Sequence, residues 1–178
     1  MDLQLDGKVV AITGGSMGIG KAVAHRLAGE GCNISICARG KESLDAAAQE
    51  LRDATGREVF SITADLTKDA DAKQFIDATA EHFGRIDILV NNAGAAPGGV
   101  LEGLSEDDWE AALQLKFMGY VRCTRHVIPH MRKQGSGRIV NVIGNDGIKH
   151  SYWEIAPGAA NAAGQNFTIS IAAQYARE

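Results

Sequence analysis

The stretch Thr13–Gly20 (TGGSMGIG) has the composition and spacing of a loop that binds phosphate. It ends the apolar run Lys8–Gly14 and opens a helical pattern, so it lies where a strand turns into a helix. Gly14 allows a tight turn, Gly18 lets the backbone approach a phosphate, and Gly20 lets helix and strand pack closely. Free N–H groups at the helix N-terminus then favour a pyrophosphate. The stretch therefore predicts a dinucleotide site, and the alternative is a glycine-rich turn without a ligand.

Groups that could exchange protons gather in the segment Asn145–Glu154 (NDGIKHSYWE). Tyr152 is its phenol and could donate a proton, or it could pack the segment together with Trp153. The other ionisable residues of the segment also fit a solvated polar loop: Asp146, Lys149, His150 and Glu154. The next stretch, Ala156–Phe167 (APGAANAAGQNF), contains no group that titrates.

These residues must be positioned by strands and helices that alternate along the chain. Strands are expected at 8–14, 33–39, 58–66, 86–94 and 137–144, and helices at 18–31, 41–56 and 69–84. A long helix should run from about Ser105, with Asp108 in capping-box position, to about Gln134, and Pro157 should open the last helix. The alternation predicts one dinucleotide-binding domain over residues 1–178, a doubly wound Rossmann-type parallel sheet with helices on both faces. Because nothing after the last helix shields the fifth strand, we expect the natural chain to continue beyond residue 178.

Composition excludes several function classes for the 178 residues. The formal net charge of −4 gives no basic surface for nucleic acid. Cys32, Cys37 and Cys123 form no CxxC pair and no metal-ligand spacing with histidine, so free thiols in a reducing cytoplasm and no metal site are expected. No apolar run is long enough to span a membrane, which predicts a cytoplasmic protein without a membrane partner.

Four motifs, in the same order, resemble the short-chain dehydrogenase/reductase family of the classical type. They are the glycine stretch, with three residues between Gly14 and Gly18, ADLT (Ala64–Thr67), NNAG (Asn91–Gly94) and GRIVN (Gly137–Asn141). The resemblance covers essentially the whole chain and implies a nicotinamide dinucleotide cofactor and a small-molecule substrate. It implies adenine contact by Asp65 and a cofactor site formed by Gly14, Ser16, Met17, Gly18, Ile19, Gly20, Asp65, Leu66, Asn92, Ala93 and Gly94.

The end of the second strand bears on the choice of cofactor. Dinucleotide enzymes often place an acid there for the ribose 2′-hydroxyl, whereas this chain has Arg39 after Ala38. A guanidinium can pair with a 2′-phosphate, so NADP(H) is favoured over NAD(H), and the alternative is an ordinary surface arginine.

The family's four catalytic positions are all substituted in this chain. By the resemblance, Gly144 replaces the serine that orients the substrate and Pro157 replaces the tyrosine that moves the proton. Asn161 replaces the lysine that assists this tyrosine, and Lys116 replaces the asparagine of the long helix. The family's Tyr-xxx-Lys pair is not simply moved upstream, since Ala156 follows Tyr152 by four positions.

Three residues remain as candidates for catalysis: Lys116, Tyr152 and Asn161. Lys116 and Asn161 have the family's two residue types in exchanged places, so we expect their side chains to approach each other directly or through one water. The alternative is that Lys116 reaches out to solvent.

Three functions fit these observations. The first is an NAD(P)(H)-dependent oxidoreductase acting on a carbonyl or alcohol with a non-standard active site. The second is a catalytically inert, nucleotide-binding member of the family that acts as a partner or sensor subunit, and the third is non-redox chemistry on the same fold. By resemblance a homo-oligomer, dimer or tetramer, is expected through the long helix and the last helix, with Phe167 and Ile171 on one stripe.

Overall fold

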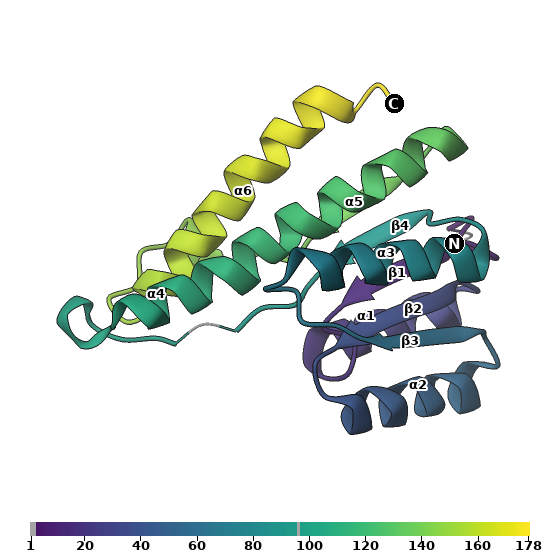
Figure 1. Cartoon of the computed structure of the whole chain (residues 1–178), viewed down its shortest axis with the longest axis horizontal. Helices are drawn as coiled ribbons and strands as arrows, with labels where there is room; N and C mark the ends of the chain where they lie inside the picture. The colour runs from purple at the N-terminus through teal and green to yellow at the C-terminus, as the bar shows by residue number, and fades with distance from the viewer. Residues whose placement is uncertain (1–2, 96) are drawn as a thin grey trace.

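The computed structural model describes residues 3–95 and 97–178, which build one parallel sheet of five strands (Figure 1). The strands pair side by side in the order β3-β2-β1-β4-β5. The order reverses beside β1, and this reversal defines a doubly wound sheet. The predicted fold class is confirmed. The strands are β1 (Val9–Thr13), β2 (Asn33–Ala38), β3 (Val59–Thr63), β4 (Ile88–Asn91) and β5 (Arg138–Asn141).

Helices cover both faces of the sheet (Figure 1). On one face, α1 (Gly18–Gly29) and α2 (Lys41–Thr55) bury a cluster that includes Ile12 and Ile34. On the other face, α3 (Asp69–Phe83) and α5 (Met118–Gln134) pack over a cluster that includes Leu89. The two clusters lie on opposite faces because successive side chains of a strand point to opposite faces of the sheet.

Three strands end three residues earlier than the sequence analysis predicts, at residue 63 instead of 66, at residue 91 instead of 94 and at residue 141 instead of 144. The physical reason is visible after β4. The backbone N–H groups of Asn92 and Ala93 both donate to the side-chain oxygen of Thr13, at 2.8 and 2.9 Å, instead of extending the sheet. Asn92 and Ala93, which follow β4, are therefore held by the last residue of the neighbouring strand β1.

The predicted long helix is not one regular helix. It consists of α4 (Glu106–Ala112), a π-helical segment η2 (Leu113–Phe117) and α5. The capping box at its start is confirmed, since Ser105 and Asp108 bond each other's backbone N–H groups. A π turn leaves helix carbonyls without their usual donors, and the Arg122 guanidinium donates to the Gln114 carbonyl at 2.9 Å. This long-range compensation could not be predicted from helix periodicity.

The last helix, α6 (Ile155–Tyr175), has Pro157 in its first turn as predicted. It packs against η2 and against η3, a short 3-10 helix formed by Asn145–Gly147; the segment Leu101–Gly103 forms another, η1. Phe167 contacts Phe117 within the chain, with ring centroids 6.1 Å apart. The homo-oligomer stays a prediction. All three cysteines are free and buried.

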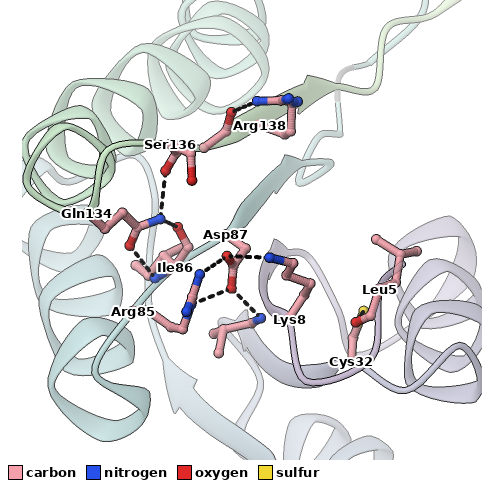
Figure 2. Close-up of polar contacts among 11 residues, drawn as sticks. Leu5, Lys8, Cys32, Arg85, Ile86, Asp87, Gln134, Ser136 and Arg138 are labelled. Carbon is pink, nitrogen blue, oxygen red and sulfur yellow. Dashed lines mark hydrogen bonds and ion pairs between the residues drawn. The ribbon is translucent and has the colours of Figure 1, made fainter. Parts of the chain in front are cut away.

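A network of charges ties the sheet together at the amino ends of β1 and β4 (Figure 2). The Asp87 carboxylate accepts hydrogen bonds from Arg85 Nε at 2.8 Å and from the backbone N–H of Val9 at 2.9 Å, and Lys8 Nζ lies 3.6 Å away. Burial by itself raises the pKa of Asp87, but these donors and positive charges outweigh it and hold the pKa below its ordinary value. Asp87 is therefore ionised in the folded protein at neutral pH.

Candidate functional site

A cavity of about 560 Å³ opens at the carboxyl ends of the strands, beside the point where the strand order reverses. Parallel α/β sheets bind their ligands at this place. The cavity is lined by Gly14, Ser16, Met17, Gly18, Ile19, Cys37, Ala38, Arg39, Gly40, Ser43, Ala64, Leu66, Asn92, Ala93, Gly94, Ala95, Leu115, Lys116 and Val142. Most of the predicted cofactor residues therefore meet in one cavity.

The glycine turn has the shape that a phosphate group needs. Gly14 and Gly18 have φ angles of 69° and 55°, the left-handed region that favours glycine. Nothing lies within 4 Å of a Cβ built on Gly18, so the backbone there is open to a ligand. Met17 is the N-cap of α1, and its side chain makes no hydrogen bond to the first turn of the helix. The backbone N–H groups of that first turn are therefore available to an anion. The cavity thus fits the phosphates of a dinucleotide.

Gly20 does not line the cavity, and its part is to keep α1 close to β1. A Cβ on Gly20 would lie 2.2 Å from the Gly14 carbonyl oxygen and 2.5 Å from Asn92 Nδ2. The same amide donates to the Thr13 carbonyl at 3.0 Å, which joins β4 to the turn. The close approach predicted for Gly20 is confirmed.

Replacing Gly20 with alanine should therefore displace the turn. We expect a loss of about 1–3 kcal/mol in the free energy of unfolding, the usual cost of overpacking, together with weaker nucleotide binding. The matched control is Gly29→Ala at the end of the same helix, where nothing lies within 4 Å of the new Cβ. Urea unfolding of both variants measures the difference, and equal stabilities would contradict the role given to Gly20.

Asp65 is the second predicted cofactor residue that does not line the cavity, although its neighbours Ala64 and Leu66 do. Its carboxylate instead accepts hydrogen bonds from the backbone N–H of Thr67, at 3.1 Å, and from the Thr67 hydroxyl, at 2.8 Å. Burial raises the pKa of Asp65, but these bonds and the nearby Lys68 lower it below its ordinary value. In this structure Asp65 shapes the turn after β3.

Lys116 lies inside the cavity and does not extend to bulk solvent. Its ammonium donates to the Val142 carbonyl at 3.2 Å and lies 5.7 Å from the centre of the Tyr120 ring. A Cβ on Gly94 would lie 2.5 Å from Lys116 Cδ, so the missing side chain at residue 94 makes room for the lysine. Burial lowers the pKa of Lys116, and the attraction of Asp146 opposes this shift.

Asn161 lies beside the same strand end but has no direct hydrogen bond with Lys116. Its Oδ1 accepts from the backbone N–H of Gly144 at 2.9 Å, and its Nδ2 donates to both oxygens of Asp146. Lys116 and Asn161 therefore bind backbone groups two residues apart, at Val142 and Gly144. The predicted direct approach is not observed, because each side chain finds a nearer partner, and an approach through one water stays a prediction.

Tyr152 does not lie in the cavity with Lys116. Its side chain is 84% exposed and does not line the cavity, and Trp153 beside it is 52% exposed. Tyr152 therefore does not pack the segment, whereas the Trp153 indole lies against Gly98, since a Cβ there would lie 2.5 Å from Trp153 Nε1. The backbone also holds the segment, because Gly99 N–H donates to the Trp153 carbonyl at 2.6 Å. Lys149, His150 and Glu154 are exposed as a solvated loop predicts, whereas Asp146 is partly buried.

Sequence reasoning missed one residue next to the cavity. The Tyr120 side chain is buried, and its hydroxyl donates to the Val142 carbonyl at 2.8 Å, the same oxygen that Lys116 binds. Burial raises the pKa of Tyr120, so this phenol stays protonated. The spacing of four residues between Lys116 and Tyr120 was the available signal, since such residues share one helix face.

Residues 3–95 and 97–178 contain neither a metal centre nor a membrane-spanning helix. No group of three His, Cys, Asp or Glu side chains there is arranged to hold a metal ion. In the same part of the chain, no helix combines the length and apolar character that a bilayer crossing requires.

Comparison with known proteins agrees with this geometry. A family profile described as short chain dehydrogenase matches residues 8–178. The chain is 34% identical over 177 residues to the 3-oxoacyl-(acyl-carrier-protein) reductase FabG of Thermotoga maritima, covering 99% of this chain and 70% of that protein. It is 35% identical over 173 residues to the corresponding reductase of Synechocystis, covering 97% of this chain and 70% of that protein.

Solved structures of other proteins have the same fold. L-sorbose reductase from Gluconobacter frateurii, complexed with NADPH and L-sorbose, matches with a TM-score of 0.96 and 30% identity over 99% of this chain and 67% of that one. NAD+-bound xylitol dehydrogenase matches with a TM-score of 0.94 and 31% identity over 98% of this chain and 67% of that one. The chain thus spans about two thirds of the length of these relatives.

Proposed function

Because the chain belongs to the short-chain dehydrogenase family, we propose that it is an NADP(H)-dependent oxidoreductase of carbonyl or alcohol substrates with a rearranged active site. The position of Lys116 carries the proposal. A partly buried ammonium lines the same cavity as the glycine turn and Asn92, so binding groups and a proton donor share one space. The named activities of the reductase and dehydrogenase relatives support the reaction class.

A nicotinamide cofactor bound in this cavity supplies or accepts hydride. The chain itself must handle the proton, because a carbonyl oxygen that is being reduced gains negative charge. Lys116 can donate that proton, and burial favours this role because it lowers the lysine pKa toward the working range. The Val142 carbonyl and the Tyr120 ring hold the ammonium in place. In alcohol oxidation the neutral amine takes the proton instead.

Arg39 is proposed to select the phosphorylated cofactor. It is exposed at the end of β2 and lines the cavity together with Gly40 and Ser43. The known structures include complexes with either cofactor, NADPH in one and NAD+ in another. The argument for NADP(H) is therefore the charge of this guanidinium at the place of the usual acid.

Replacing Arg39 with alanine should weaken NADP(H) binding by roughly 1–3 kcal/mol, the scale of a charge-assisted contact, and leave NAD(H) binding nearly unchanged. The control is Arg26→Ala on α1, which removes an exposed arginine paired with Glu30 outside this cavity. Calorimetric titration with both cofactors measures the effect. Equal losses for NADPH and NADH, or no loss, would refute the assignment.

The proposed reaction is tested by following nicotinamide absorbance with a panel of carbonyl compounds and alcohols. The panel should contain a 3-oxoacyl thioester, L-sorbose and xylitol, the compounds suggested by the names of the relatives. Turnover with any carbonyl–alcohol pair supports the proposal. Tight NADPH binding without turnover favours the inert, nucleotide-binding alternative, for which the exposed Tyr152 is the supporting observation.

A further inference from the structure

The Arg122 side chain joins the π-helical segment η2 to the turn after β3. Its guanidinium donates through Nη1 to the Leu66 carbonyl at 3.1 Å and to the Gln114 carbonyl at 2.9 Å. Through Nη2 it also donates to Gln114 Oε1 at 2.6 Å. A guanidinium presents its donors in a fixed planar fork, so these acceptors are held in one geometry. Arg122 thereby fastens η2 to a residue that lies 56 positions before the arginine in the chain.

Both fastened segments form part of the cavity wall. Leu66 lines the cavity from the turn after β3, and Leu115 and Lys116 line it from η2. Leu66 is 3% exposed, and a Cβ built on Gly119 would lie 3.5 Å from Leu66 Cβ, so the start of α5 packs directly on this turn. Arg122 does not itself line the cavity. It can therefore act on the wall without touching a bound ligand.

The direction of Lys116 depends on the π turn that Arg122 holds. The Met118 N–H bonds the Leu113 carbonyl five residues earlier, which is the spacing of a π turn. Successive residues of an α-helix differ by about 100° around the axis. A change of η2 to the ordinary four-residue spacing would thus rotate Lys116 relative to α5 and away from the Val142 carbonyl that it binds.

We propose that Arg122 is a positioning residue, which holds the π turn η2 against the turn after β3 and so keeps Lys116 directed into the cavity. The effect on catalysis rests on the proposed function. The effect on geometry does not, because it depends only on the hydrogen bonds of Arg122 and can be measured without a substrate.

Amide hydrogen exchange followed by NMR tests the hold on the π turn. Arg122→Met keeps the apolar part of the side chain and removes the guanidinium. Exchange at Met118 should become about 10-fold faster or more, the effect of losing hydrogen bonds to a charged group, while exchange at Val127 later in α5 stays near the wild-type rate. An unchanged rate at Met118, or equal acceleration of both amides, would overturn the proposal.

The matched control is Arg125→Met. Arg125 is an exposed arginine of the same helix, and its guanidinium donates to Asp69 on α3 at 2.6 Å instead of to the cavity wall. This variant should leave the exchange rate of Met118 unchanged. An acceleration like that of Arg122→Met would contradict the specific role given to Arg122.

The contact between Lys116 and Gly94 is a readout that a merely structural role would not move. A Cβ on Gly94 would lie 2.5 Å from Lys116 Cδ, so the α-hydrogen in that direction touches the lysine. A nuclear Overhauser effect should join Gly94 Hα to Lys116 Hδ in the wild type, with the lysine resonances assigned by their loss in Lys116→Met. It should be lost in Arg122→Met, and its persistence there would overturn the proposal.

Arg122→Lys separates the charge from the planar fork. The ammonium keeps the positive charge but cannot hold the same acceptors in one plane. Exchange at Met118 should therefore lie between the rates of the wild type and Arg122→Met, and a wild-type rate would contradict the proposal. Should Arg122→Met fail to fold, Arg122→Lys serves for the exchange and Overhauser measurements with the same direction of change.

Turnover separates this inference from the proposed function. If NADPH is oxidised, Arg122→Met should lower kcat by roughly 10-fold, because the donor is misplaced but still present, and NADPH affinity should change less. A lost contact between Lys116 and Gly94 in a protein without turnover would leave the positioning role standing and refute the oxidoreductase. Turnover with that contact kept in Arg122→Met would do the reverse.

Discussion

Lys116→Met should lower kcat by about 100-fold or more, the usual contribution of a positioned proton donor. Methionine keeps much of the length and volume of the lysine, so the packing against Gly94 survives while the ammonium is lost. NADPH binding should change far less than kcat, because the glycine turn and Arg39 are untouched. Steady-state kinetics with the best substrate of the panel, together with calorimetric titration of NADPH, measures both effects.

The pH dependence gives this prediction a second readout. An ammonium donor is lost as the pH rises through its pKa, so wild-type carbonyl reduction should fall at high pH, and Lys116→Met should lack that fall. Lys133→Met, which removes an exposed lysine from the last turn of α5, is the matched control and should keep wild-type kinetics. A Lys116→Met protein with wild-type kcat would exclude the lysine as the donor.

Asp87→Asn should be the most destabilising of the conservative changes considered, although it lies at the opposite end of the sheet from the cavity. We expect a loss of about 2–3 kcal/mol and a melting temperature lower by roughly 5–10 °C. The carboxylate is 7% exposed and accepts from Arg85 and from the Val9 backbone, and an amide turns one of its acceptors into a donor that faces the guanidinium.

The sign of the pH effect follows from the lowered pKa of Asp87. Its ionised form contributes stability above the unfolded-state pKa of an aspartate, about 3.9, and the contribution is lost as the pH falls through the folded-state pKa. The gap between wild type and Asp87→Asn should therefore narrow in acid. Urea unfolding from pH 7 to pH 3 measures it.

The control for Asp87 is Asp45→Asn, which breaks an exposed pair with Lys41 on α2. Such pairs contribute about 0.5 kcal/mol or less, so little change is expected at any pH. If the two variants lost the same stability, the network in Figure 2 would not have the structural importance given to it.

The sequence by itself determined the order of strands and helices, the doubly wound sheet and the nucleotide end of the cavity. Each of these features was predicted from residues that lie close together in the chain. The capping box joins Ser105 to Asp108, three positions apart. Gly20 meets the carbonyl of Gly14 within one turn. Local spacing carries such information because both partners belong to the same strand–turn–helix unit.

Only the tertiary structure decided how Lys116, Asn161 and Tyr152, the three candidates for catalysis, are arranged. Lys116 reaches the Val142 carbonyl across 26 residues, and Asn161 holds Asp146 across 15. Family spacing identified Lys116 and Asn161 but paired them with each other, whereas packing gives each a different partner. Tyr152 was a candidate because it is the phenol of the segment Asn145–Glu154, and the loop turns that side chain outward. The contacts of Lys116 with the Val142 carbonyl and of Asn161 with the Gly144 N–H have no local signature, because each arises where distant segments pack.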